Sequence, residues 1–402
     1  MRYLLYIILL FNNIYISNID GFPISVFVNL LIVVYLLIFR KSSTNNIRSS
    51  KIISFLMIIF TYSILNGTLS QSIYYPYVIV MNIIFIITIT LYLNSYYNHS
   101  ILLLTLAVFI INNIITAGLI VQSSAVIEFA GKFNDIFNIT SRTTYRINGI
   151  TGGTLKAGII SYYIFFLSVY FVQNKPLKYL LASTSVAFSF FQARTAMLFM
   201  GITIIFYLAY SLRTFKKQIK PKNFLSLILL ISLIFSVARS STKYLKTNYS
   251  FFEGTIAWQK EALDNGLDTG SVSSLNKTVE RELNRALNKS SFLGLFVGNG
   301  QTNWKGEDSV KSDNGFVVQF IGFGVLGSII IWFGYLMLFG ILRNRYRSIN
   351  KQFIFIYLNL FFCHLLLNYK STSLIGFNYL HPFIISLWVI HFELNKSNKH
   401  GV

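Results

Sequence analysis

Arginines in the polar segments of this chain are its best candidates for holding an anion. Arg142 and Arg146 lie in the glycine-containing stretch SRTTYRINGITGGTLKAG, Arg194 interrupts an apolar stretch at FQARTAMLFMG, and Arg281 and Arg285 lie in LNKTVERELNRALNK. A guanidinium clamps a phosphate well, because its planar fork bonds two oxygens and stays charged. The set therefore predicts a site for an anionic substrate. The alternative is that these arginines only solvate loops or meet lipid headgroups.

A carboxylate and an amide, Asp313 and Asn314, stand directly before a long apolar run in KSDNGFVVQFIGFGVLGSIIIWFGYLMLFG. Two interpretations stay open for Asp313. It caps the helix that SDNG opens, where a carboxylate favours the positive end of the helix dipole, or it is a functional group where water meets lipid. Close approach of other helices or of a lipid is expected at the glycines that follow, at positions 315, 322, 324 and 327.

Histidine and cysteine patterns predict no metal site. The five histidines are scattered, the single Cys363 lies in an apolar run, and there is neither a P-loop nor an HExxH motif. His381, in NYLHPF, is either a polar residue at the membrane interface or a substrate contact. His364 lies inside an apolar run and is predicted to be a packed core residue. We therefore expect an activity that needs no metal and no other cofactor.

The composition predicts a membrane protein. Of 402 residues, 54% are hydrophobic and 12% are charged, whereas a soluble domain is about 25% charged. Lipid must cover part of this chain. The net charge of +21 fits membrane orientation and an anionic substrate better than a nucleic-acid partner. The first 20 residues lack a small-x-small cleavage site and are predicted to form a membrane helix rather than a signal peptide.

Apolar runs long enough to approach the roughly 20 residues of a membrane helix predict an all-α polytopic protein with about twelve spans. Arg194 separates two of them, because a centred arginine costs several kcal/mol in lipid. The predicted spans are about 3–17, 22–39, 52–68, 74–93, 100–121, 157–173, 179–192, 196–212, 224–238, 315–340, 353–369 and 380–393.

The short loops predict the orientation. RKSSTNNIRSSK, QNKPLK, RTFKKQIKPK and RNRYRSINK are basic and carry no acid, so they and both termini are assigned to the cytoplasm. Of the 13 Asp and Glu residues, all except Glu393 fall on the other side. The chain is then a single integral membrane domain, 1–402, with external loops at about 122–156 and 239–314. Apolar and basic residues recurring every four positions predict an amphipathic helix at 275–289 in the larger loop.

The chain resembles bacterial O-antigen polymerases, members of a superfamily of polytopic O-antigen ligases and polymerases. The span number and the large external loop before the last helices match. FQARTAMLFMG resembles a Ser-Arg-Thr-Ala-like segment of the family, with Ala193 in place of serine. Asn314, followed after nine residues by Gly324 and then by Gly327, resembles a His-Asn segment in which Asp313 replaces histidine.

A second family pattern, an arginine with a glycine after ten residues, is matched by Arg142 and Gly153. Neither Arg281 nor Arg285 has a glycine at that spacing. The resemblance implies a GT-C-like membrane fold with a partly helical periplasmic loop, in the bacterial inner membrane, with its active site facing the periplasm.

The resemblance also implies the reaction. A growing glycan moves from undecaprenyl pyrophosphate to the outer sugar of a new lipid-linked repeat unit, without metal. Asp313 is then the first candidate to act on the sugar hydroxyl, and Arg142 and Arg194 are candidates to stabilise the departing pyrophosphate. The implied substrate-binding residues are Arg146, Gly153, Arg281, Arg285, Asn314 and His381. Membrane lipid and a chain-length regulator are the implied partners.

Three alternatives remain at this point. An O-antigen ligase would use the same fold with a lipid A-core acceptor, although Asp313 in place of histidine favours the polymerase. A flippase for lipid-linked oligosaccharide would be expected to carry ionisable groups at mid-membrane and repeat symmetry. A membrane anchor or scaffold would carry no chemistry at all.

Overall fold

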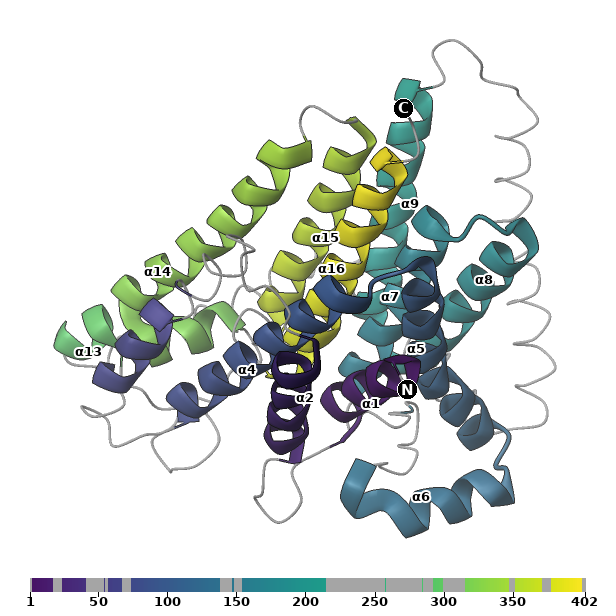
Figure 1. Cartoon of the computed structure of the whole chain (residues 1–402), viewed down its shortest axis with the longest axis horizontal. Coiled ribbons are helices and arrows are strands. Elements are labelled where there is room, and N and C mark those ends of the chain that lie inside the picture. Colours follow the sequence, from purple (N-terminus) through teal and green to yellow (C-terminus); the bar gives the residue numbers. More distant parts are fainter. Residues whose placement is uncertain are drawn as a thin grey trace. The chain divides into compact units, whose positions relative to one another are not determined.

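The computed structural model of the chain is all-helical (Figure 1), with no strand among the residues that it describes. A contact-based division separates it into two units, Met1–Leu104 with Ser271–Val402, and Thr105–Gly270. The described residues are 2–16, 24–40, 54, 57–66, 74–137, 147, 154–214, 257, 284, 292–298, 315–346, 351–370 and 377–399.

Helices occupy every predicted span except the one near 224–238, which lies outside the described residues. Among the described residues, two helices lie within segments predicted as external loops, α6 (Ser124–Phe137) and α13 (Phe292–Val297). The others are α1 (Arg2–Ile14), α2 (Ile24–Arg40), Met57–Asn66, α4 (Tyr74–Tyr96), α5 (His99–Ile120), α7 (Thr154–Phe171), α8 (Lys175–Gln192), α9 (Arg194–Thr214), α14 (Gly315–Tyr346), α15 (Lys351–Lys370) and α16 (Phe377–Lys399).

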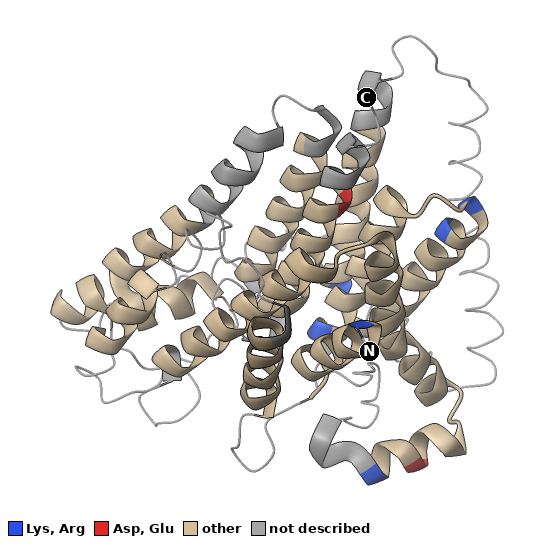
Figure 2. Ribbon diagram, viewed as in Figure 1, with Lys and Arg blue, Asp and Glu red and all other residues tan. Residues whose placement is uncertain are grey.

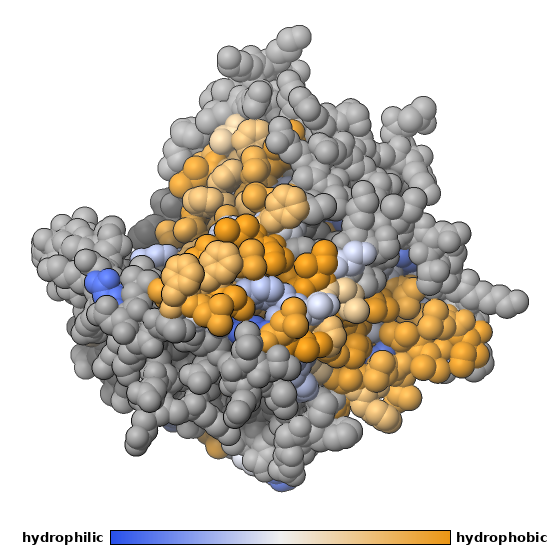
Figure 3. All heavy atoms as spheres, turned by 90° about the vertical axis from the view of Figure 1, so that its left-hand side faces the viewer, coloured by the Kyte–Doolittle hydropathy of each residue, from blue (hydrophilic) through white to orange (hydrophobic). Residues whose placement is uncertain are grey.

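The described helices are those of a membrane protein. Three are long and apolar enough to cross a bilayer, Pro76–Tyr96, His99–Ile120 and Gly315–Gly334, and several shorter apolar helices accompany them. Charged side chains are sparse along the described ribbon (Figure 2). Hydrophobic side chains make up most of the described surface on the face shown in Figure 3. Such a surface is typical of a protein that lies in a membrane.

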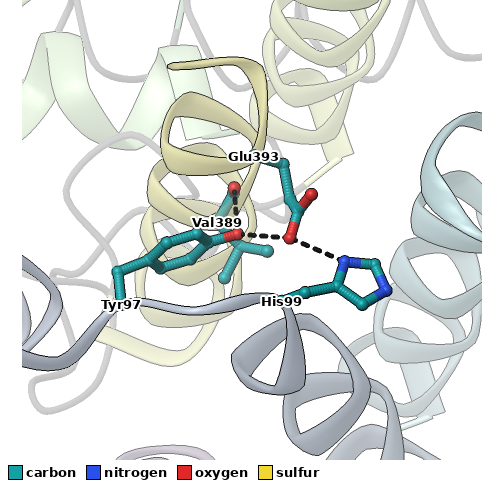
Figure 4. A network of polar contacts seen from close by, with 4 residues as sticks. All are labelled: Tyr97, His99, Val389 and Glu393. Carbon is teal, nitrogen blue, oxygen red and sulfur yellow. Dashed lines mark hydrogen bonds and ion pairs between the residues drawn. The ribbon is translucent and has the colours of Figure 1, made fainter. Parts of the chain in front are cut away.

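In the first unit, α4 packs against α1, α2 and α16, while α14 packs against α13 and α15. The turn between α4 and α5 is tied to α16 by the carboxylate of Glu393 (Figure 4). The Tyr97 hydroxyl donates to its Oε1 at 2.8 Å, and the Nδ1 atom of His99 lies 3.0 Å from the same oxygen. Burial, and after it the charge of Glu393, raise the pKa of the Tyr97 phenol, so the hydroxyl stays protonated and donates. Glu393, the one acidic residue predicted on the cytoplasmic side, thus has a structural role, because it links the α4–α5 turn to α16.

In the second unit, α7 packs against both α8 and α9. The start of α8 follows from local sequence. The side chain of Asn174 accepts from the backbone N–H of Leu177 at 3.1 Å, and Pro176 stands in the first turn, where its missing N–H costs nothing. The end of α8 is set by Ala193, whose backbone is extended. Arg194 then begins α9, which confirms the predicted break between two helices at this arginine.

Candidate functional site

Of the predicted site residues, the structure describes Arg194 in the second unit and His381 in the first. The remaining predicted site residues lie outside the described part of the chain, and their roles stay predictions: Arg142, Arg146, Gly153, Arg281, Arg285, Asp313 and Asn314.

The junction between α8 and α9 presents Arg194 in a partly buried setting. Two of its guanidinium nitrogens, Nε and Nη2, are shielded from solvent. Because α9 begins at this residue, the positive end of the helix dipole lies beside the guanidinium. A guanidinium stays charged when it is buried, and a low dielectric strengthens its attraction for an anion. The junction therefore has the electrostatic character of an anion site.

Helix α7 passes close to this junction because Gly158 has no side chain. A Cβ atom at Gly158 would lie 2.6 Å from the Cβ of Ala193 and 3.2 Å from that of Ala196. Lys156 precedes Gly158 by two residues and so belongs to the same end of α7. It is a second cation at this end of the unit, and it was not among the predicted site residues.

Ile147, which follows Arg146 in the sequence, is anchored at the same junction. The backbone N–H of Ile147 donates to the carbonyl of Phe191 at 3.2 Å, and its side chain is fully buried. That side chain packs in a cluster with Leu119, Ile115, Ile120, Val126 and Phe191. Phe191, the partner of Ile147, is two residues before Ala193 in the sequence. Ile147, the described residue next to Arg146, therefore lies close to the α8–α9 junction.

A buried polar network holds the end of α8 against α5 and α7. The hydroxyl of Ser161 lies 2.7 Å from both Asn113 Oδ1 and Gln192 Oε1. The amide nitrogen of Gln192 donates to the hydroxyl of Thr116 at 3.0 Å, and Thr116 donates to the carbonyl of Asn112 at 2.8 Å. These groups fix the residue two positions before Arg194, so the network positions the junction.

The direction of this network follows from the number of protons. A hydroxyl has one proton, so Ser161 cannot donate to both Asn113 and Gln192. The amide of Gln192 is oriented by its bond to Thr116, which leaves its oxygen for Ser161. Ser161 therefore donates to one of the two amide oxygens at a time, Asn113 Oδ1 or Gln192 Oε1. The hydrogen bonds from Ser161 to Gln192 and from Gln192 to Thr116 link α7, α8 and α5.

Replacing Gln192 with methionine is expected to lower stability by about 1–3 kcal/mol, because the side chain keeps its length but leaves buried hydroxyls without their partner. The measurement is the midpoint of thermal unfolding of the purified protein in detergent. Ser183→Ala is the matched control on α8, since Ser183 is only half-buried and bonds carbonyls of its own helix. Equal midpoints for the two variants would contradict this role of the network.

His381 lies in a second buried polar cluster, in the first unit. Its Nδ1 atom lies 3.2 Å from the carbonyl oxygen of Asn13 and must carry the proton, because a carbonyl only accepts. Its Nε2 atom lies 3.1 Å from Asn82 Oδ1, and Phe85 stacks on the ring at 4.1 Å. Asn13 and Asn29 exchange a reciprocal pair of amide hydrogen bonds. A substrate contact by His381 would have to displace one of these partners.

The glycine motif of α14 marks a break in that helix. Gly324 has φ 63° and ψ −171°, a conformation that is essentially restricted to glycine. The amide of Asn66 donates to the freed carbonyl of Gly322, and the hydroxyl of Tyr62 lies 2.9 Å from that of Phe323. Close approach was predicted for Gly324 and Gly327, and it is confirmed. An added Cβ would lie 2.5 Å from Gly298 N at the first position and 2.5 Å from Tyr62 Cε1 at the second.

Comparison with protein-family models, with curated proteins and with solved structures finds no match for this chain.

Sequence reasoning missed the polar partners of these motifs. Ser161, Gln192, Tyr62 and Asn66 were not singled out, although each is a hydroxyl or amide side chain inside or beside an apolar run. That pattern was the available signal, because a polar group in such a run needs a partner. In the described residues no group of three or more His, Cys, Asp or Glu side chains is placed to hold a metal ion.

Proposed function

We propose that this membrane protein is a glycosyltransferase of the O-antigen polymerase type, with about twelve spans and both termini in the cytoplasm. It moves a growing glycan from undecaprenyl pyrophosphate to the outer sugar of a new lipid-linked repeat unit at the periplasmic face. Metal-independent chemistry is part of the proposal, with arginine as the cation that stabilises the leaving pyrophosphate.

One observation carries the proposal. The arginine of the FQARTAMLFMG motif begins a helix at a partly buried junction, and Ile147, which follows Arg146 in the sequence, bonds the carbonyl of Phe191 beside it. Ile147 and Phe191, each adjacent to or within a motif segment, thus meet in one unit. A pyrophosphate needs several cations, because charge grows on the leaving group in the transition state. The lipid part of the substrate is consistent with an apolar, lipid-covered helical protein.

The direct test is genetic complementation with a polysaccharide readout. Deleting the gene in its own host and restoring it on a plasmid should remove and restore the ladder of chain lengths on a gel. A lipid A-core that carries a single repeat unit after deletion supports the polymerase. A core with no repeat unit at all would indicate the ligase or the flippase instead.

Asp313→Asn is expected to abolish chain growth while the protein still accumulates in the membrane, because asparagine keeps the shape but removes the base. If helix capping is the only role of Asp313, this variant is nearly silent, since asparagine caps about as well as aspartate. The gel ladder measures the first property and an immunoblot of membranes the second. A full ladder from Asp313→Asn would remove Asp313 from the mechanism.

A transporter of lipid-linked oligosaccharide is the second candidate, and one observation favours it. His381 is an ionisable group 1% exposed among α1, α4 and α16, with Asn13 and Asn82 as partners. Buried ionisable groups among membrane helices often line transport pathways. The deletion phenotype separates this candidate from the polymerase.

A further inference from the structure

Helix α13 is a short apolar helix with exposed side chains. Its sequence is FLGLFV, and none of its residues is buried. Phe292, Leu293 and Phe296 are 85%, 60% and 48% exposed. Six residues are too few for a helix to be stable alone in water, and a contiguous apolar surface of this kind is normally covered. Something therefore covers α13.

The end of α13 is fixed to the interior of α14 rather than to its beginning. Gly298, with φ 95°, packs backbone to backbone against Gly322, Phe323 and Gly324, and a Cβ at Gly298 would lie 2.5 Å from the carbonyl oxygen of Gly322. Gly324 follows Gly315 by nine residues, which is about 13 Å along a helix. The membrane-spanning part of α14, Gly315–Gly334, has 20 residues and is about 30 Å long. The contact thus lies close to the middle of the span.

The surface of α14 around this contact is itself apolar and exposed. Val325, Ile329 and Phe333 are 40%, 59% and 61% exposed. In a helix long enough to cross the membrane, such side chains face acyl chains. Figure 1 shows α13 beside α14. The exposed residues of α13 therefore continue a surface that already faces lipid.

Side-chain donors lie at the backbone carbonyls around the break, as a hydrocarbon environment requires. Within a bilayer no water is present to bond free backbone groups, so irregular backbone needs partners from the protein. The amide of Asn66 donates to the carbonyl of Gly322. The single proton of the Tyr62 hydroxyl serves either the carbonyl of Val297, at 2.7 Å, or that of Phe323, at 2.9 Å. The N–H of Gly298 donates to the carbonyl of Gly294 at 2.8 Å.

We propose that α13 is a re-entrant segment within the hydrocarbon of the bilayer, with Phe292, Leu293 and Phe296 covered by the acyl chains of membrane lipid. The external loop predicted for 239–314 accordingly has a membrane-embedded part near its end. This inference is independent of the proposed glycosyltransferase activity.

The test is depth-dependent fluorescence quenching on the full-length protein in phosphatidylcholine vesicles. Cys363 is replaced by alanine, and single cysteines at Leu293→Cys or Phe296→Cys are labelled with a small environment-sensitive fluorophore. Ile329→Cys on α14 is the control for lipid. Glu128→Cys on α6 is the control for water, because Glu128 is 66% exposed in an ion pair with Lys132.

Both α13 positions are expected to be quenched by lipids with a nitroxide in the acyl chain as strongly as position 329, and to resist aqueous iodide. Quenching by iodide to the level of position 128 would overturn the proposal, because it would place α13 in water. Resistance to both quenchers would also overturn it, since protein, such as a second copy of this chain, would then cover the helix. Two labelled positions guard against a local effect of one substitution.

Discussion

Replacing Arg194 with lysine is expected to lower the rate of glycan chain growth well below that of the wild-type protein. Replacing it with alanine is expected to lower the rate further, to about a hundredth of the wild-type rate. Lysine keeps the charge but loses the two-pronged hydrogen bonding of the guanidinium. A charge-assisted contact that strengthens in the transition state contributes about 3 kcal/mol, which corresponds to the hundredfold loss. Because its Nε and Nη2 atoms are shielded from solvent, Arg194 is the described residue whose substitution is expected to lower activity most.

The measurement is the distribution of chain lengths formed by purified variants in vesicles supplied with the lipid-linked repeat unit. Lys132→Ala is the matched control, because Lys132 is an exposed cation of the same unit in a surface pair with Glu128. Such surface pairs contribute about 0–1 kcal/mol, so this variant should keep its ladder. A full ladder from Arg194→Ala, with normal membrane levels, would exclude Arg194 from the phosphate clamp.

Lys156→Ala extends the same experiment. If the end of α7 contributes to the anion site, this variant loses activity, although less than Arg194→Ala because an ammonium group bonds as a single point charge. If only the arginines of the motif segments matter, its ladder is unchanged. The comparison therefore measures how far the cationic site extends from the α8–α9 junction onto α7.

The helices could be predicted from the sequence because lipid imposes a simple rule on length and polarity. Even the break at Arg194 followed, since a guanidinium in the centre of an apolar run is too costly to place in lipid. The charge of Arg194 within an apolar run thus indicated both the helix boundary and the candidate site. The helix α6 was not predicted because its charged residues make it too polar for a span, and α13 was not predicted because six residues are too few.

Contacts between distant residues could not be predicted in the same way. Spacing within KSDNGFVVQFIGFGVLG shows that glycines recur, but it does not show that Gly324 meets Gly298 or that Tyr62 and Asn66 bond the freed carbonyls. These partners are separated from the motif by up to some 260 residues. Polar residues in apolar runs indicate that a partner exists, while only the packing of helices reveals which one.

The glycine at the break gives the second large expected effect. Gly324→Ala is expected to destabilise the protein by at least about 3 kcal/mol, because two costs combine. The backbone conformation at φ 63° and ψ −171° is strained for any residue with a side chain. The added Cβ would also lie 2.5 Å from the backbone nitrogen of Gly298 and 2.5 Å from the carbonyl oxygen of Phe296, and backbone atoms cannot turn aside.

Gly201→Ala on α9 is the matched control for this substitution. No heavy atom lies within 4 Å of a Cβ built at Gly201, and its helical backbone accepts alanine, so a gain of up to about 1 kcal/mol is expected. The measurement is the amount of monodisperse protein that survives heating in detergent, read by size-exclusion chromatography as a function of temperature. Wild-type behaviour of Gly324→Ala would mean that α14 runs straight through residue 324 and that α13 does not pack there. If monodisperse protein is lost on heating for Gly324→Ala but not for Gly201→Ala, the glycine of the motif is required for the structure of a broken membrane helix, whatever reaction the protein catalyses.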